Sequence, residues 1–312
     1  MPGSSREDGD PAGRRSSPSI GQRLAFNGYR AGSVVARAIP RPLLPPMRRV
    51  LATVMYRAAT GRRRMVERHL QRVHGRPMEG AELRREVQRA FDSYARYWVE
   101  SFRVPAMSGE EIDSAMTAEG LEHLEAAKAA GNGAILALPH LGSWDYGGAW
   151  LARNGYPLTV VVEPLDPPEL LEWFADLRQG LGMEVVPLGL SASTAVMRTL
   201  RANGYVALLS DRDIAGGGVE VEFFGERTTL PAGPATIAIR TGAALLPTTV
   251  YHVGEDHHRG VVRPPIDCTR RGSLRDDVAR ITQVLADELA DLIRGAPEQW
   301  HVFQPNWPSD RE

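Results

Sequence analysis

The second half of the chain alternates short apolar runs with segments of helical periodicity, and this alternation constrains the fold more than any other feature. The apolar runs are 133–139, 158–163, 184–188, 205–210 and 244–252, and the segments of helical character are 170–180, 191–202, 235–241 and 274–294. Apolar runs of this length are typical of strands buried on both faces, as in parallel sheets covered by helices. The sequence therefore predicts an α/β fold with a mostly parallel central sheet flanked by helices. Residues 219–224 alternate apolar and acidic side chains and predict a half-exposed strand.

The first third of the chain combines helical periodicity with an excess of positive charge. Between Arg14 and Arg103 there are 20 arginines and 6 acidic residues, a net charge of +14, although the whole chain carries only −1. The arginines interrupt every apolar stretch, so none reaches the roughly 18–20 residues that a transmembrane helix needs. We expect three parts: a disordered polar tail over 1–19, a basic helical region over 20–104 and an α/β domain over 105–312. The tail lacks the apolar core of a signal peptide, so export is not indicated.

The basic helical region has two interpretations. Amphipathic helices with arginine-rich faces suit an interface with anionic lipid, and they suit equally a packed subdomain with a solvated basic face. Its last segment, 83–102, places Phe91, Tyr94, Tyr97, Trp98 and Phe102 on one stripe, which is typical of a domain core or interface. A basic region joined to an acidic remainder indicates an anionic partner, either membrane lipid or nucleic acid.

A histidine stands at the end of the first apolar run, within the string LPHLGSWD at 138–145. In open α/β sheets, functional groups collect at the carboxyl ends of strands, which is where His140 falls. Histidine titrates near neutrality and can take a proton from an alcohol. Asp145 follows five residues later, on a helix expected to begin near Ser143. The chain has no Gly-x-Ser-x-Gly motif, and Cys268 has no activating neighbours, so a covalent intermediate is not expected.

The spacing of His140 and Asp145 resembles the His-x4-Asp motif of the glycerolipid and lipid A acyltransferases. Five further blocks stand in compatible order: 93–98 (SYARYW), 178–185 (RQGLGMEV), 211–213 (DRD), 223–226 (FFGE) and 231–235 (PAGPA). The span 62–306 is similar to the lipid A biosynthesis lauroyl/myristoyl acyltransferase family, and it most closely resembles the actinobacterial phosphatidylinositol mannoside acyltransferases. The chain departs from many relatives at Leu141 and Ser143, where Asn or Gly is common, which bears on acceptor geometry.

The resemblance implies a glycerolipid-acyltransferase-like fold and an O-acyltransferase that uses His140 as a general base. It further implies transfer of a fatty acyl group, palmitoyl by expectation, from acyl-CoA to a hydroxyl of a phosphatidylinositol mannoside. Acyl-CoA is then a co-substrate and no cofactor is expected. The expected partners are acyl-CoA, anionic membrane lipid and the glycolipid acceptor, without nucleic acid. The expected location is peripheral, on the cytoplasmic face of the plasma membrane.

A histidine base needs a carboxylate that holds its tautomer and stabilises the imidazolium ion. Asp145 is one candidate, but five helical positions would turn it about 140° away from His140. It can reach His140 only if the histidine precedes the helix, and it could instead brace an arginine such as Arg178. Asp211 is the second candidate, because two strands that end side by side would bring it to His140. The resemblance implies a carboxylate from 211–213, and we favour Asp211 over Asp145.

Further substrate contacts are expected from charged and aromatic residues of the same blocks. Arg178 and Arg212 suit a phosphate of the carrier or acceptor, although an ion pair explains each equally well. Glu163 ends the run 158–163 at the same sheet edge, where it suits acceptor hydroxyls. Phe223 and Phe224, together with 231–239, suit the wall of an acyl channel, although an aromatic pair more often belongs to a core.

Three histidines, His252, His257 and His258, raise the question of a metal site. We place 254–258 in a polar turn between strands, without the paired spacing of a zinc site, so the sequence predicts no bound metal.

Other functions are compatible with parts of this pattern. A related acyltransferase could act on a lysophospholipid or a lipid A-type acceptor. From different classes, the basic region could bind nucleic acid, or the protein could bind lipid without catalysis. The sequence has no helix-turn-helix, zinc-finger or RNA-binding aromatic signature, which disfavours nucleic acid. The intact His140 and both candidate carboxylates disfavour a non-catalytic protein.

Overall fold

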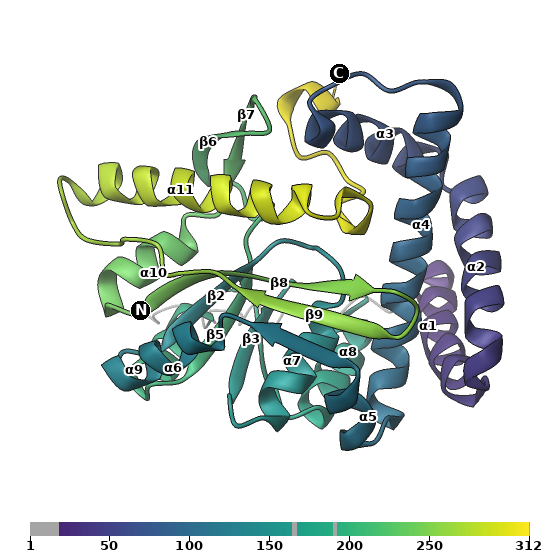
Figure 1. Ribbon diagram of the computed structural model, residues 1–312, viewed down its shortest axis with the longest axis horizontal. Helices are drawn as coiled ribbons and strands as arrows, with labels where there is room; N and C mark the ends of the chain where they lie inside the picture. The colour runs from purple at the N-terminus through teal and green to yellow at the C-terminus, as the bar shows by residue number, and fades with distance from the viewer. Residues whose placement is uncertain (1–18, 164–166, 190–191, 312) are drawn as a thin grey trace, which may run out of the picture.

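The predicted α/β architecture is confirmed in the computed structural model, which describes residues 19–163, 167–189 and 192–311 (Figure 1). Its central sheet has the strand order β1-β9-β8-β2-β5-β3-β4. The strands are β1 Met116–Glu119, β2 Ala134–Leu138, β3 Leu158–Val162, β4 Glu184–Pro187, β5 Tyr205–Leu209, β8 Ala244–Val253 and β9 His257–Val262. All neighbouring pairs are parallel except β8 and β9, so most of the sheet is parallel, as predicted.

Helices supply most of the remaining structure. They are α1 Ile20–Ala38, α2 Leu44–Ala58, α3 Thr60–His74, α4 Gly80–Arg103, α5 Gly109–Ser114, α6 Leu121–Ala130, α7 Trp144–Arg153, α8 Pro168–Gly180, α9 Ala192–Arg201, α10 Gly233–Thr241 and α11 Leu274–Arg294. Short 3-10 turns occupy Arg41–Leu43, Val104–Ala106, Pro297–Gln299 and Pro308–Arg311. The predicted tail over 1–19 lies outside the described residues except for Ser19, which caps α1 together with Gln22.

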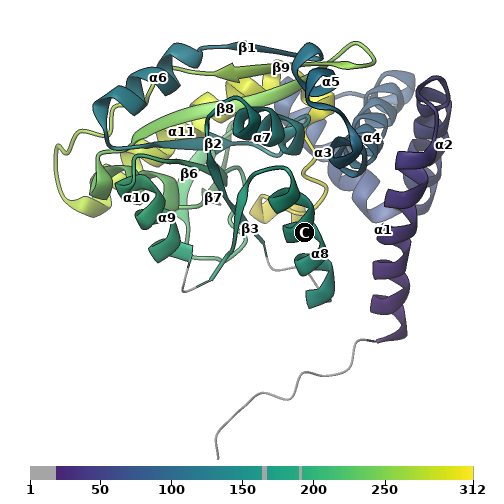
Figure 2. The same ribbon diagram turned by 90° about the horizontal axis from the view of Figure 1, so that it is seen from below.

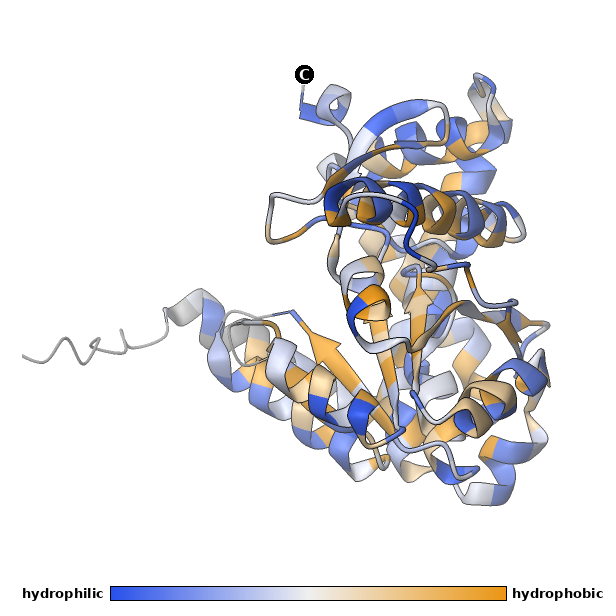
Figure 3. Ribbon diagram, turned by 90° about the vertical axis from the view of Figure 1, so that its left-hand side faces the viewer, coloured by the Kyte–Doolittle hydropathy of each residue, from blue (hydrophilic) through white to orange (hydrophobic). Residues whose placement is uncertain are grey.

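Both faces of the sheet are covered, because successive side chains of a strand point to opposite sides. Ile135 and Ala137 of β2 join a core formed with α9, α10 and α11, whereas Leu136 and Leu138 join a second core that includes α6. Figure 3 shows the strands largely in apolar colours, while the helices around them alternate apolar and polar residues. The continuous apolar runs of the sequence therefore mark strands with two buried faces.

The expected strand at 219–224 forms, but it lies outside the central sheet. β6 Val219–Phe223 pairs only with β7 Glu226–Leu230 in a two-stranded antiparallel hairpin. A second expectation is wrong: the turn after β8 covers only 254–256, and β9 begins at His257. His257 and His258 are therefore strand residues. The sequence pattern does not reveal this strand, because its first residues follow a polar turn; it pairs with both β8 and β1.

The basic region forms the helices α1 to α4 at one end of the molecule (Figures 1 and 2). Helix α4 lies at the centre of this region, because α1, α2 and α3 all contact α4. Phe91 and Phe102 of the predicted aromatic stripe are buried in two small apolar clusters on α4. No helix in the described part of the chain is long and apolar enough to cross a membrane. The division at 104 stays a prediction.

Candidate active site

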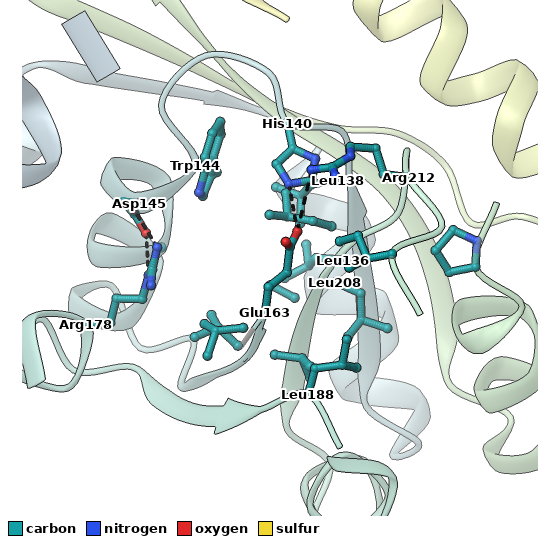
Figure 4. A pocket seen from close by; sticks show the side chains of 18 of the residues that line it. Leu136, Leu138, His140, Trp144, Asp145, Glu163, Arg178, Leu188, Leu208 and Arg212 are labelled. Atoms are coloured by element: carbon teal, nitrogen blue, oxygen red, sulfur yellow. Dashed lines mark hydrogen bonds and ion pairs between the residues drawn. The ribbon is translucent and has the colours of Figure 1, made fainter. Parts of the chain in front are cut away.

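Three neighbouring strands bring the principal polar residues together at one edge of the sheet. β2 and β5 are paired so that Leu138 lies opposite Leu209. His140 and Asp211 each follow two residues beyond this pair, so the parallel register places them side by side. Glu163 directly follows β3, which pairs with the other edge of β5. Figure 4 shows Glu163 pointing toward His140 at this edge.

His140 and Asp211 form a buried pair with a defined orientation. The ring Nδ1 of His140 lies 2.6 Å from Oδ1 of Asp211, and the backbone N–H of His140 donates to Oδ2 at 2.9 Å. Trp300 donates from Nε1 to the same Oδ2 at 2.7 Å. Asp211 has no exposed surface. Because Nδ1 points to the carboxylate, Nε2 is the ring nitrogen left to face a substrate, and it lies 3.7 Å from Oε1 of Glu163.

The two carboxylates control the protonation of His140. Burial alone would lower the pKa of His140, but the charges and hydrogen bonds of Asp211 and Glu163 outweigh burial and raise it to about 9. Burial alone would raise the pKa of Asp211, but its interaction with His140 and its hydrogen bonds bring that pKa below the ordinary value. The protonated imidazole is therefore well stabilised, as a proton-accepting base requires of its product state.

The loop after β2 holds His140 in place. Gly142 has φ of 64°, and a Cβ there would lie 2.0 Å from the carbonyl oxygen of Val250, so only glycine fits. Its N–H donates to the carbonyl of Gln299 at 2.9 Å, and the carbonyl of His140 accepts from the N–H of His301 at 2.7 Å. Leu141 is fully buried in the core. These contacts with β8 and with the segment 299–301 fix the backbone around His140.

Asp145 pairs with Arg178, the alternative to His140 that the sequence left open. Arg178 donates to Asp145 from Nε at 2.7 Å and from a terminal nitrogen at 3.3 Å. Tyr97 and Ser101 also donate to Asp145, at 2.8 and 3.2 Å. The structure therefore pairs His140 with Asp211 and not with Asp145. Arg178 is likewise held by Asp145, as Figure 4 shows, so its guanidinium is committed to that carboxylate.

A cavity of about 480 Å³ opens beside His140. Its wall is mainly apolar and comes from β2, β3, β5 and the helices around them, including Leu136, Val160 and Ala207. Glu163 and Arg212 also line it, and their side chains approach to 4.0 Å. This size and lining are typical of sites that take a small or chain-like apolar ligand. His140 thus stands between a polar group, Glu163, and an apolar chamber.

Two of the predicted contacts lie elsewhere. Phe223 and Phe224 are not among the cavity's lining residues and instead pack against Trp300 and Trp307. The structure places both rings on the β6–β7 hairpin, outside this cavity, and their role in an acyl channel stays a prediction. The neighbouring segment does contribute, through Pro231, Gly233, Pro234 and Ile237.

Sequence reasoning missed other residues of this site. Tyr94, Tyr97 and Trp98 were expected only in a core or interface, but they also line the cavity, as does Trp144. The sequence pattern does not single out Trp300, which donates to Asp211. An aromatic stripe on a helix has the same spacing whether it lies in a core or lines a cavity, so the spacing alone does not distinguish these two environments. The indole contact depends on a segment 89 residues further along the chain.

Comparison with known proteins adds independent information. A family model described as bacterial lipid A biosynthesis acyltransferase matches residues 22–309. A phosphatidylinositol mannoside acyltransferase of Mycolicibacterium smegmatis is 40% identical over 295 residues, covering 93% of this chain and 94% of the relative. One of Mycobacterium tuberculosis is 41% identical and covers 90% of this chain and 88% of its own. A lipid A biosynthesis acyltransferase of Haemophilus influenzae is 30% identical, covering 58% of this chain and 55% of its own.

Proposed function

Because the chain belongs to the bacterial lipid A biosynthesis acyltransferase family and is an O-acyltransferase, we propose that it acylates a phosphatidylinositol mannoside. The proposed donor is acyl-CoA, and the proposed acyl group is palmitoyl. The observation that carries the proposal is the His140–Asp211 pair at the edge of the apolar cavity. Identity of about 40% over most of the chain to two enzymes named for this acceptor supports the choice of glycolipid.

The proposed reaction is a direct attack of the acceptor hydroxyl on the thioester. Nε2 of neutral His140 takes the hydroxyl proton while the oxygen forms a bond to the acyl carbon. The charge of Asp211 stabilises the resulting imidazolium ion and fixes the Nδ1–H tautomer. Collapse of the tetrahedral intermediate breaks the carbon–sulfur bond, and the proton on His140 passes to the departing thiolate. The reaction calls on no bound cofactor and no covalent enzyme intermediate.

The cavity and its polar edge suit the two substrates. The apolar wall, with Leu136, Val160 and Ala207, suits the acyl chain of the donor. Glu163 lies 3.7 Å from the reactive nitrogen of His140, where its carboxylate suits hydrogen bonds from the sugar hydroxyls of the acceptor. Arg212 lies beside Glu163, and its guanidinium suits a phosphate of either substrate. We do not assign Arg178 a substrate contact in this proposal, because its guanidinium already donates to Asp145.

The helices α1 and α2 suit attachment to a membrane surface. Val34, Val35, Leu43, Val50 and Val54 lie on α1, α2 and the turn between them, and each is more than half exposed. Exposed arginines lie on the same two helices, including Arg30, Arg37, Arg49 and Arg57. Apolar side chains next to arginines favour binding to anionic lipid. These features support our proposal that the enzyme is a peripheral protein of the cytoplasmic face of the plasma membrane.

The test is transfer from palmitoyl-CoA to phosphatidylinositol dimannoside by the purified protein, followed by mass spectrometry of the lipid. We expect acylated glycolipid from the wild type and a loss of at least about 100-fold in His140→Ala, the scale of a lost general base. His123→Ala, which changes a histidine of α6 away from the cavity, should keep full activity. Full transfer by His140→Ala contradicts the proposed base. Transfer to a lysophospholipid or lipid A precursor, but not to the mannoside, contradicts the proposed acceptor.

A further inference from the structure

A second cluster of chemically capable side chains lies apart from His140. Glu100 of α4, His252 of β8 and His258 of β9 each offer one ligand atom, and these atoms lie within 4.8 Å of one another. His252 and His258 are directly opposite in the antiparallel β8–β9 pair, so both rings stand on the same face of the sheet. Helix α4 and the β8–β9 hairpin, which are far apart in the sequence, therefore converge on one point.

The distances within the cluster match those of a metal centre. Oε2 of Glu100 lies 3.0 Å from Nε2 of His258 and 3.1 Å from Nε2 of His252. Zinc binds histidine nitrogen and carboxylate oxygen at about 2.0–2.2 Å, which in a tetrahedron separates neighbouring ligand atoms by about 3.3 Å. An ion bound here would replace the contact between Glu100 and His258, and it would move Oε2 of Glu100 a few tenths of an ångström away from the two nitrogens.

The cluster is buried, and its hydrogen bonding is incomplete. His252 and His258 are 8% and 3% exposed. Within the described part of the chain, neither ring nitrogen of His252 has a hydrogen-bond partner; its Nε2 is close to Glu100 without the alignment of a hydrogen bond. Buried imidazole nitrogens are nearly always paired. A cation held between Glu100 and the histidines would use the free lone pair of His252.

The surroundings hold the three side chains in position. Nε of Arg96 donates to Oε1 of Glu100 at 2.6 Å, which turns Oε2 toward the histidines. The ring of Tyr146 stacks on His258 with centroids 3.9 Å apart. The hydroxyl of Ser143 lies 2.9 Å from Oε2 of Glu100, within reach of a fourth position. Such support of first ligands by fixed neighbours is typical of metal sites.

An entry route is present as well. Glu100 and His258 both line a second cavity of about 140 Å³, which is separate from the cavity beside His140. This cavity brings solvent-sized space to the cluster without passing the proposed acyl site. Its lining residues carry charges of both signs: Arg37, Arg41, Arg48, Arg96, Arg103, Glu111, Glu255 and Asp256.

We propose that Glu100, His252 and His258 bind one divalent transition-metal ion of the Zn²⁺ type, with the Ser143 hydroxyl or a water as fourth ligand. Two imidazoles and one carboxylate are the donor set that zinc accepts readily. The bound ion ties α4 to the β8–β9 hairpin, and through Ser143 to the start of α7. Its role is structural, and it takes no part in the acyl-transfer step. The proposal differs from the expectation of no metal, which considered the histidines without Glu100.

The test uses untagged full-length protein, because a histidine tag would bind the probe ion. The protein is dialysed against EDTA, returned to chelator-free buffer and titrated with ZnCl₂ by calorimetry, with the metal content measured after gel filtration. We expect one zinc per chain and a rise in unfolding temperature of about 5 °C at saturation. Co²⁺ should give the intense visible bands of a four-coordinate site. None of these readouts depends on acyl transfer.

Matched variants separate this site from incidental zinc binding. Glu100→Gln and His258→Gln should each weaken binding by about 100-fold, since each removes one of three ligands. His257→Gln should bind as the wild type does, because His257 is the exposed neighbour of His258. Less than a tenth of an equivalent of zinc in the wild type overturns the proposal. Equal zinc binding by Glu100→Gln and the wild type also overturns it. A pale Co²⁺ spectrum, typical of six-coordination, overturns it as well, and that measurement uses only the wild type.

Discussion

Two buried aspartates near the cavity have different partners: Asp145 lines the cavity, and Asp211 contacts His140, which lines it. Asp211 accepts from the ring and backbone of His140, whereas Asp145 accepts from Arg178. Histidine changes its charge near neutral pH, but arginine stays protonated at every physiological pH. The first pair can therefore move a proton, while the second can only hold charge and geometry. The two residues of the His-x4-Asp motif thus belong to separate pairs, with separate consequences when each is broken.

The surroundings of the pairs reinforce this difference. Nε2 of His140 is directed toward Glu163 and the cavity, so the histidine keeps one functional nitrogen free of Asp211. Arg178 uses two nitrogens on Asp145, and Tyr97 adds a third hydrogen bond to that carboxylate. We infer that the Asp145 pair fixes the start of α7 against α4 and α8, and that it contributes to stability more than to chemistry.

The largest expected effect comes from Asp211→Asn. The amide keeps the size of the side chain but removes the charge that stabilises the imidazolium ion and favours the Nδ1–H tautomer. We expect kcat to fall by roughly 100- to 1,000-fold while KM changes little. Steady-state kinetics with palmitoyl-CoA measure this, and circular dichroism checks the fold. A loss smaller than about 10-fold in a folded variant would remove Asp211 from the proposed proton relay.

Asp145→Asn should instead act on stability. It leaves the buried guanidinium of Arg178 without its counter-charge, which costs roughly 3–5 kcal/mol in the free energy of unfolding. At a temperature where the variant is folded, we expect kcat within about 10-fold of the wild type. Urea unfolding and kinetics on the same sample give both numbers. The double variant Asp145→Asn/Arg178→Gln should recover part of the lost stability. If Asp145→Asn alone lost as much kcat as Asp211→Asn, the two pairs would not differ in function.

Glu163→Gln should produce the smallest effect, a displacement of the pH profile. The carboxylate of Glu163 helps to raise the pKa of His140, so its neutralisation lowers that pKa. Only neutral His140 can accept a proton, so activity increases as pH rises through the pKa, and the midpoint of kcat/KM should move to lower pH. We expect a shift of about half to one pH unit. Glu125→Gln, on α6 and outside the cavity, is the control and should leave the midpoint in place.

Much of the fold was predictable because its physical cause is local. Buried strands such as β2 and β5 are short apolar runs, and their boundaries lie within about one or two residues of the predicted ones. The juxtaposition of His140 and Asp211 followed from a general property of parallel sheets, since adjacent strand ends meet at one edge. These features needed no knowledge of distant contacts.

The remaining features depend on contacts that periodicity does not encode. The sequence allowed Asp145 to pair with His140 or Arg178, and the geometry of the loop around Gly142 decided between them. Trp300 reaches Asp211 across 89 residues, and Glu100 meets His258 across 158. Strand β9 begins with polar residues, so its sequence predicts a turn, and only its pairing with β8 identifies it as a strand. Contacts over such separations are specified by tertiary packing.

The pH dependence of kcat/KM for wild type and Asp211→Asn tests the central claim most directly. With Asp211 and Glu163 in place, the pKa of His140 is raised to about 9, so kcat/KM of the wild type should still be rising between pH 6.5 and 9, with its midpoint near pH 9. In Asp211→Asn the residual activity should titrate at clearly lower pH, because the main stabilising charge is gone. A wild-type midpoint at or below 6.5 that Asp211→Asn leaves unmoved would contradict the assignment of His140 and Asp211 as the catalytic pair.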